Sequence, residues 1–174
     1  MSRPLRIALI ALAALVLLAL AALGASAALD RPARIMMVSS TVDAPKREVW
    51  AVLSDFDDYD QWNPVITSAH GEPRVGAELD LELTLPDHEP EELDAEVLIA
   101  RGERKLRWQD RLFLPGVRDW EYEFVIQPLE PGRVVVVQLL RSEGLLAPFT
   151  DEEAAREALA LIGEALAEQI ASTG

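Results

Sequence analysis

Apolar and polar residues alternate with a period of two over most of the chain after residue 78. The alternation runs through four segments, which cover residues 79–85, 93–99, 106–112 and 120–126, and a near-continuous β-branched segment follows at 134–140. Residues typical of turns separate these segments: Pro86-Asp87, Arg101-Gly102, Pro115-Gly116 and Pro131-Gly132. Side chains two residues apart on a strand share one face, so each segment has an apolar side and a polar side. Short strands joined by short turns predict an antiparallel meander that is buried on one face and solvated on the other.

The region before the meander predicts one more strand at each end of a helical segment. Residues 36–42 alternate like a strand, and the period of two returns after Val65. Between them, apolar residues recur at helical spacing over 45–56, with Pro45 in the first turn. Residues 57–63 predict a second short helix, which Pro64 ends. The chain therefore contains seven predicted strands.

A long amphipathic helix is predicted at the C-terminus. Its apolar stripe consists of Ala155, Leu159, Ile162, Leu166 and Ile170. Thr150 with Glu153 three residues later predicts a capping box at its start. A helix of 21 residues from Asp151 is about 31 Å long, enough to cross a whole sheet.

The N-terminal segment is a candidate for export or for membrane anchoring. Residues 7–23 are all Ala, Leu, Ile or Val, and the uncharged stretch extends to residue 29, which as a helix spans about 35 Å. Arg3 and Arg6 precede it, so the remainder is expected outside the cytoplasm. Two interpretations stay open: a signal peptide cleaved after Ala25-Ser26-Ala27, or an uncleaved anchor. We assign residues 1–29 to this signal peptide or transmembrane anchor, 30–35 to a linker and 36–172 to one domain.

Charge and composition narrow the functional classes. The chain has 16 Lys and Arg against 30 Asp and Glu; without Arg3 and Arg6 the remainder carries 14 against 30, a net charge of −16. Such an acidic surface argues against nucleic acid as a partner. The chain has no cysteine, which excludes disulfides and thiol catalysis. No P-loop, GxGxxG, HExxH or Ser-His-Asp pattern is present, so no cofactor is expected.

The two histidines do not predict a metal site. His88 lies in an acidic turn, where a metal is conceivable but solvation is the ordinary role of such residues. His70 follows a strand and has no obvious partner in the sequence. No metal ligands are therefore assigned.

One group of short motifs resembles a known superfamily. It consists of Val42-Asp43-Ala44-Pro45, Glu48-Val49-Trp50, Leu53-Ser54-Asp55-Phe56, Tyr59 and Trp62-Asn63-Pro64. Weaker pieces follow in order: Gly71-Glu72-Pro73, Val75-Gly76, Leu106-Arg107-Trp108, residues 124–132 and Gly144-Leu145-Leu146. Together they resemble the SRPBCC (START-like, polyketide cyclase/dehydrase-like) superfamily over residues 36–170.

The resemblance implies an α+β helix-grip fold. In this fold a bent antiparallel sheet of seven strands wraps around the long C-terminal helix, with two short helices after the first strand. Members bind lipids, sterols, polyketides and other hydrophobic molecules in a cavity between sheet and helix, and some are cyclases or aromatases. The motifs are mostly structural, so the resemblance identifies the fold rather than a reaction.

The candidate ligand-binding residues come from the buried strand faces and the helix stripe. Trp108, Trp120, Tyr122 and Phe124 lie on the apolar faces of two adjacent strands, and Gln138 interrupts the valine run of the last strand. With the helix residues Leu159, Ile162 and Leu166 they form the predicted pocket wall. The alternative is that the same side chains fill a close-packed core.

Asp110 is the ninth residue of this predicted ligand-binding set, and it is also the first candidate for catalysis. By alternation it faces inward with Leu106 and Trp108, where a carboxylate is costly unless it is paired or protonated. A raised pKa would suit a general acid or base. Three alternatives remain for Asp110: a β-bulge that turns its side chain outward, a position at the solvent-exposed entrance of the cavity, or pairing with Arg118 or Arg74.

Three functions follow from these patterns. The first is an exported or membrane-tethered domain that binds a hydrophobic small molecule or lipid, with the membrane contacted through residues 7–29 if they are uncleaved. The second is a cyclase-, aromatase- or isomerase-like enzyme that uses Asp110, Tyr122 or Gln138 in the same cavity. The third is a protein-interaction module that uses the acidic stretch 80–96, which has eight acidic residues and no Lys or Arg.

Overall fold

The domain is a seven-stranded antiparallel sheet curved around a long helix. The computed structural model describes residues 12, 14–20, 33–86 and 88–173. The elements in chain order are β1 (Arg34–Val42), α2 (Lys46–Ser54), η1 (Phe56–Asp58), α3 (Tyr59–Trp62), β2 (Ile66–Gly71), β3 (Glu78–Leu83), β4 (Glu91–Arg101), β5 (Lys105–Arg111), β6 (Asp119–Glu130), β7 (Arg133–Glu143), η2 (Ala147–Phe149) and α4 (Glu152–Thr173).

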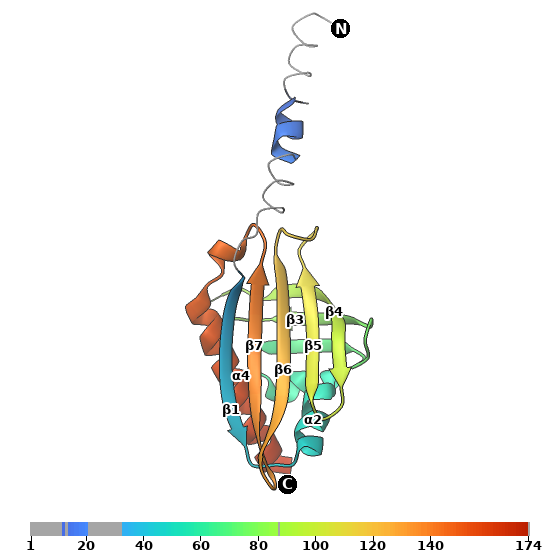
Figure 1. Ribbon diagram of the computed structural model, residues 1–174, viewed down its shortest axis with the longest axis vertical. Helices are drawn as coiled ribbons and strands as arrows, with labels where there is room; N and C mark the ends of the chain where they lie inside the picture. Colours follow the sequence, from blue (N-terminus) through green and yellow to red (C-terminus); the bar gives the residue numbers. More distant parts are fainter. Residues whose placement is uncertain (1–11, 13, 21–32, 87, 174) are drawn as a thin grey trace, which may run out of the picture.

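The strand order confirms the predicted α+β helix-grip fold. The sheet runs β1-β7-β6-β5-β4-β3-β2, with every neighbouring pair antiparallel, so the strands from β2 to β7 form a meander and β1 joins its far edge. Figure 1 shows β2 and β3 crossing behind β5 and β6, which is how the bent sheet encloses α4. The inner face carries the apolar half of each alternating segment, including the fully buried Leu79, Leu106 and Phe124.

Complementary charges on the outer face fix the β5–β6 pairing. Lys105 Nζ donates to Glu123 Oε1 at 2.9 Å, and Arg107 Nη1 donates to Glu121 Oε2 at 3.2 Å. Such cross-strand pairs contribute roughly 0.2–1 kcal/mol each. On the other side the register places Glu96 opposite Gln109.

The start of α4 differs from the predicted capping box. Asp151 Oδ1 accepts hydrogen bonds from the backbone N–H groups of Glu153 and Ala154, at 3.1 and 3.0 Å, so Asp151 is the N-cap. Thr150 is unavailable because its hydroxyl bonds to that of Ser142 at 2.8 Å. The N-cap is therefore Asp151 rather than Thr150, and the predicted long helix is otherwise as expected.

A glycine lets the middle of α4 approach the sheet closely. A Cβ added to Gly163 would overlap the Ser40 hydroxyl on β1 and lie 3.0 Å from Gln138 Nε2 on β7. The helix backbone therefore rests directly on these two strands. Gln138 Nε2 donates to the Leu159 carbonyl at 2.8 Å at the same level, which joins helix and sheet by a buried hydrogen bond.

Most of the N-terminal segment lies outside the described residues. Of the predicted signal peptide or anchor, 1–29, only residues 12 and 14–20 are described, and they are helical. Within the described part of the chain, no helix has both the length and the apolar character needed to cross a bilayer. The prediction for residues 1–29 and the boundaries of the linker stay predictions.

Replacing Gly163 by Ala tests the close approach of α4. Helix propensity alone favours Ala by about 1 kcal/mol, but the overlap with Ser40 is expected to reverse the sign and lower the free energy of unfolding by about 1–3 kcal/mol. Urea denaturation measures the change. Gly102→Ala is the matched control, because its added Cβ meets only Trp50 Nε1 at 4.0 Å. The double variant Gly163→Ala/Ser40→Ala should recover most of the loss. Equal stability of Gly163→Ala and Gly102→Ala would contradict the close contact between Gly163 and Ser40.

Candidate functional site: an apolar cavity between sheet and helix

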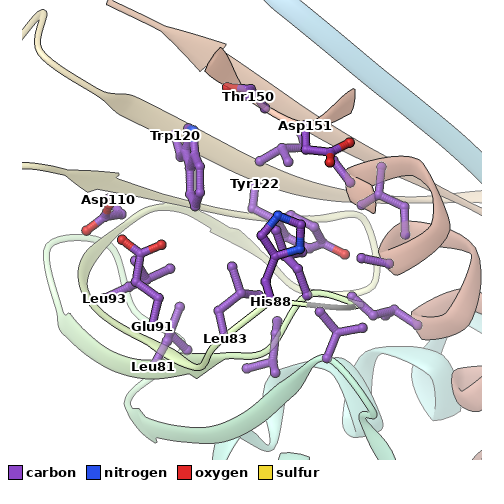
Figure 2. A pocket seen from close by; sticks show the side chains of 18 of the residues that line it. Leu81, Leu83, His88, Glu91, Leu93, Asp110, Trp120, Tyr122, Thr150 and Asp151 are labelled. Carbon is purple, nitrogen blue, oxygen red and sulfur yellow. The ribbon is translucent and has the colours of Figure 1, made fainter. Parts of the chain in front are cut away.

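A cavity of about 230 Å³ lies between the inner face of the sheet and the N-terminal half of α4. Its wall is largely apolar and comes from β2 to β7, the segment 85–91, η2 and α4. The lining consists of Val65, Ile66, Leu81, Leu83, Leu85, His88, Glu89, Glu91, Leu93, Trp108, Asp110, Trp120, Tyr122, Leu140, Phe149, Thr150, Asp151, Ala155, Ala158, Leu159 and Ile162. In Figure 2, His88 and Leu83 lie across the cavity from Thr150 and Asp151.

The structure brings six of the nine predicted ligand-binding residues into this wall: Trp108, Asp110, Trp120, Tyr122, Leu159 and Ile162. It leaves out Phe124, Gln138 and Leu166, which are fully buried below the cavity and belong to the packed interior. The physical reason is that side chains fill the interior next to the cavity. There Trp108 packs against both Phe56 and Phe124, at ring-centroid distances of 6.1 and 5.9 Å. The aromatic residues of these strand faces therefore divide between the cavity wall and the packed interior.

Two aromatic rings form the inner part of the wall. Trp108 on β5 and Tyr122 on β6 are opposite each other in the register and stack at a centroid distance of 5.0 Å. Phe124 meets Tyr122 edge-on at 5.0 Å and supports it from below. Aromatic pairs in these geometries contribute about 0.5–1.5 kcal/mol beyond their buried area. The inner wall is therefore rigid and flat.

A short chain of hydrogen bonds connects the floor of the cavity to α4. Tyr122 Oη donates to Gln138 Oε1 at 2.6 Å, and Gln138 Nε2 donates to the Leu159 carbonyl. Burial raises the pKa of the Tyr122 phenol well above 10, so the hydroxyl stays protonated. Both polar atoms of Gln138 thus have a protein partner, and the residue does not line the cavity, so its contacts are structural.

Asp110 forms a charged cluster with Arg118 and Glu91 beside the cavity. Arg118 Nη2 donates to Asp110 Oδ2 at 3.1 Å, and Nη1 of the same guanidinium pairs with Glu91. The guanidinium also lies over the Trp120 ring, 4.2 Å from its centroid. Burial raises the pKa of the Asp110 carboxyl, while the hydrogen bond and charge of Arg118 lower it in part. Of the alternatives for Asp110, pairing with Arg118 is the one observed; Arg74 pairs with Glu72.

Hydrogen bonds also tie three elements together at the outer side of the cavity. Trp120 Nε1 donates to Ser142 Oγ at 3.1 Å, and Ser142 Oγ shares a hydrogen bond with Thr150 Oγ1. These contacts join β6, β7 and the residue before the N-cap of α4. They hold Trp120 and the start of α4 in place around the cavity.

In the described part of the structure, neither histidine belongs to a group of potential metal ligands. His88 lines the cavity, and its Nδ1 is 2.7 Å from the Pro86 carbonyl. His70 Nδ1 is 3.2 Å from Asp57 Oδ1 on the surface, a partner that the sequence did not reveal. Among the residues with described positions, no group of three or more His, Asp and Glu side chains is arranged to hold a metal ion.

The half of the wall opposite the aromatic rings was not assigned from the sequence. Leu81 and Leu93 come from adjacent strands, and Phe149 and Thr150 come from η2 and the residue that follows it. The period of two had placed the leucines on the buried face, so the signal was present for them. Phe149 carries no periodic signal, because it lies in a single turn of 3₁₀ helix.

Comparison with known proteins agrees with this architecture. A family model described as "Polyketide cyclase / dehydrase and lipid transport" matches residues 35–173. No curated protein matches the sequence. A START superfamily protein from Mycobacterium smegmatis is similar in structure, with a TM-score of 0.68 and 20% identity over 80% of this chain and 99% of that chain.

Two enzymes of known structure share the fold. Norcoclaurine synthase from Thalictrum flavum, in complex with dopamine and hydroxybenzaldehyde, has a TM-score of 0.63 and 14% identity over 82% of this chain and 89% of that chain. Zhui aromatase/cyclase from Streptomyces sp. R1128 has a TM-score of 0.58 and 20% identity over 80% of this chain and 94% of that chain. At these identities the likeness shows the fold alone.

Removal of Arg118 tests the charged cluster. In Arg118→Ala the Asp110 carboxylate loses its cation, so its pKa should rise further above the ordinary 3.8. The native state then binds this proton more tightly than the unfolded state, and stability should fall as pH rises above about 4. We expect a loss of about 3 kcal/mol at pH 7 and a smaller loss at pH 4, measured by urea denaturation.

The matched control is Arg111→Ala on the same sheet end. Arg111 is half-exposed and 3.9 Å from Asp119, so its removal should cost about 1 kcal/mol or less. The pairing of Arg118 with Asp110 is contradicted by a loss in Arg118→Ala that is the same at both pH values.

Proposed function

Because the chain belongs to the polyketide cyclase/dehydrase and lipid transport family, we propose that it binds an apolar small molecule or part of a lipid in the cavity beneath α4. The observation that carries the proposal is the cavity itself, which has an aromatic wall on β5 and β6 and an aliphatic wall on β3, β4 and α4. Apolar pockets with a few convergent polar groups are the usual form of small-molecule sites.

The size of the cavity limits the ligand. At about 230 Å³ it is below the roughly 300–1,000 Å³ of pockets for drug-sized molecules. It therefore suits a compact ring compound or the end of an acyl chain. A larger ligand would have to extend out of the mouth near Phe149 and Glu89.

The charge of the wall limits the ligand further. The acidic lining residues are Glu89, Glu91, Asp110 and Asp151, and no Lys or Arg of the described chain lines the cavity. Arg118, the nearest guanidinium of the cluster, is already shared between Asp110 and Glu91. A neutral or cationic apolar molecule is therefore favoured over a carboxylate.

An enzymatic role of cyclase, aromatase or isomerase type is the second candidate. The observation in its favour is Asp110, a carboxyl group in the cavity wall whose pKa is raised by burial. A raised pKa suits general acid or base catalysis. The ion pair with Arg118 provides the structural alternative for the same residue.

We also propose that the domain works outside the cytoplasm. The apolar run of residues 7–23 and the basic residues before it support this location, either as a released or as a tethered protein.

Filling the cavity tests the binding function. Ala158→Leu places a larger side chain into the wall and should abolish binding while the domain stays folded. Extraction of the purified chain followed by mass spectrometry measures the co-purifying ligand, and titration with 3-phenylpropanol measures affinity through Trp108 and Trp120 emission. Ala160→Leu is the matched control on the same helix, since Ala160 does not line the cavity. Equal binding by both variants would place the ligand elsewhere.

A matched ligand series tests the charge preference. 3-Phenylpropylamine and 3-phenylpropanol should bind at least tenfold more tightly than 3-phenylpropionate, a difference of about 1.4 kcal/mol by isothermal titration calorimetry. Glu89→Gln should reduce the discrimination, whereas Glu103→Gln in the β4–β5 turn should leave it unchanged. Tightest binding of the propionate would exclude the proposed class.

Asp110→Asn separates the two candidate functions. If the protein is a binding module, the variant should retain affinity for 3-phenylpropanol within a factor of a few, because the wall keeps its shape. If Asp110 transfers a proton, turnover of any substrate identified by extraction should fall at least 100-fold, in line with the usual contribution of a general acid or base. The readouts are calorimetry and product analysis on the same samples.

A further inference from the structure

Four large apolar side chains are exposed on two neighbouring loops. Phe113 and Leu114 in the β5–β6 loop are 87% and 65% exposed, and Leu146 and Phe149 after β7 are 37% and 82% exposed. We refer to these four residues as the apolar rim. Scattered exposed apolar residues are common, but a group of this kind beside a cavity is characteristic of an interaction surface.

The rim is held together by the backbone. Leu145 N–H donates to the Gly116 carbonyl and Leu146 N–H donates to the Val117 carbonyl, each at 2.9 Å. The two loops therefore form one unit. Within it, Phe113 has a φ of +60°, a conformation that bulky residues rarely adopt, and its ring stands in solvent.

The rim adjoins the cavity. Phe149 belongs both to the rim and to the cavity lining, and Thr150 and Asp151, which follow it, also line the cavity. A ligand that enters beside η2 thus passes the rim.

The start of the domain lies at the same end of the sheet. Arg34, the first residue of β1, pairs with Ser142 near the end of β7, and Ser142 pairs with Trp120 near the start of β6. Figure 1 shows the start of β1, the β5–β6 loop and η2 together at one end of the domain. Four residues separate the end of the apolar segment at residue 29 from Arg34, so the two positions are at most about 17 Å apart in extended chain.

We propose that the apolar rim docks on a lipid bilayer, so that the cavity opens toward the membrane. The bilayer is the occupant favoured here because an anchor at residues 7–29 would hold this end of the domain within reach of the membrane surface; in this respect the proposal rests on the proposed tether. With a net charge of −16 after residue 27, attraction to anionic lipids is not the driving force. Docking depends on burial of the rim and is insensitive to salt.

Single labelled cysteines test the docking, because the native chain has none. Four full-length variants, each with one cysteine that carries an NBD fluorophore, are reconstituted in phosphatidylcholine vesicles with and without acyl-chain spin labels. The variants are Phe113→Cys, Phe149→Cys, Leu20→Cys and Leu129→Cys. Leu129 is the matched control, since it is 51% exposed in the β6–β7 hairpin at the opposite end of the sheet. Quenching is expected at least fivefold stronger at positions 113 and 149 than at 129, and equal at low and high salt.

Position 20 distinguishes failure of the rim from failure of the tether. Quenching at 20 without quenching at 113 and 149 overturns the docking and leaves the tether intact, and absence of quenching at all positions overturns both. A blue shift at 113 that depends on protein concentration in the absence of lipid assigns the rim to a second copy of the chain and also overturns the proposal. Positions 20, 113 and 129 are not part of the cavity lining, so their readouts do not depend on whether the cavity holds a ligand, and a failure of the binding function is detected separately.

Discussion

The arrangement of the molecule depends on the place where α4 touches the sheet. Gly163 brings the helix backbone onto β1 and β7, and the buried bond from Gln138 to the Leu159 carbonyl fixes the helix at that height. Below this contact the interior is filled by side chains such as Phe124 and Leu166. Above it the helix presents Ala155 and Ala158, whose short side chains do not reach the aromatic wall, and the cavity occupies that space. One close contact and two small residues therefore determine where the cavity lies.

The strands and helices were predicted from their periodicity, whereas their helix-grip arrangement was implied by the resemblance to the SRPBCC superfamily. Seven strands, two short helices and a long helix follow from repeats of two and 3.6 residues, which tertiary context rarely overrides over such lengths. It was harder to predict whether an inward-facing side chain lines the cavity or fills the core. Trp108 and Phe124 both face inward, but only a three-dimensional packing arrangement decides that the first lines a cavity and the second fills the core. Contacts formed by irregular segments were also missed, as for the wall residue Phe149 and the cap at Asp151.

Charge is distributed unequally along the outer face of the sheet. On β5 and β6, basic and acidic side chains face each other and stabilise the pairing. On β3 and β4 the register places Asp80 opposite Asp94 and Glu78 opposite Glu96, which is destabilising by similar amounts. Nothing in the structure explains this acidic surface. On the inner face, by contrast, the charge of Asp110 is matched by Arg118.

The position of β1 has a consequence for how the chain folds. This strand is at the edge of the sheet, and its one neighbour is β7, so that Val42 pairs with Val134 and Arg34 with Ser142. The two partners are separated by roughly 100 residues, and contacts of such long sequence separation form slowly. The first strand synthesised thus finds its place only after almost the whole domain has emerged. A delay of this kind leaves the edge of β1 open to mispairing until β7 arrives.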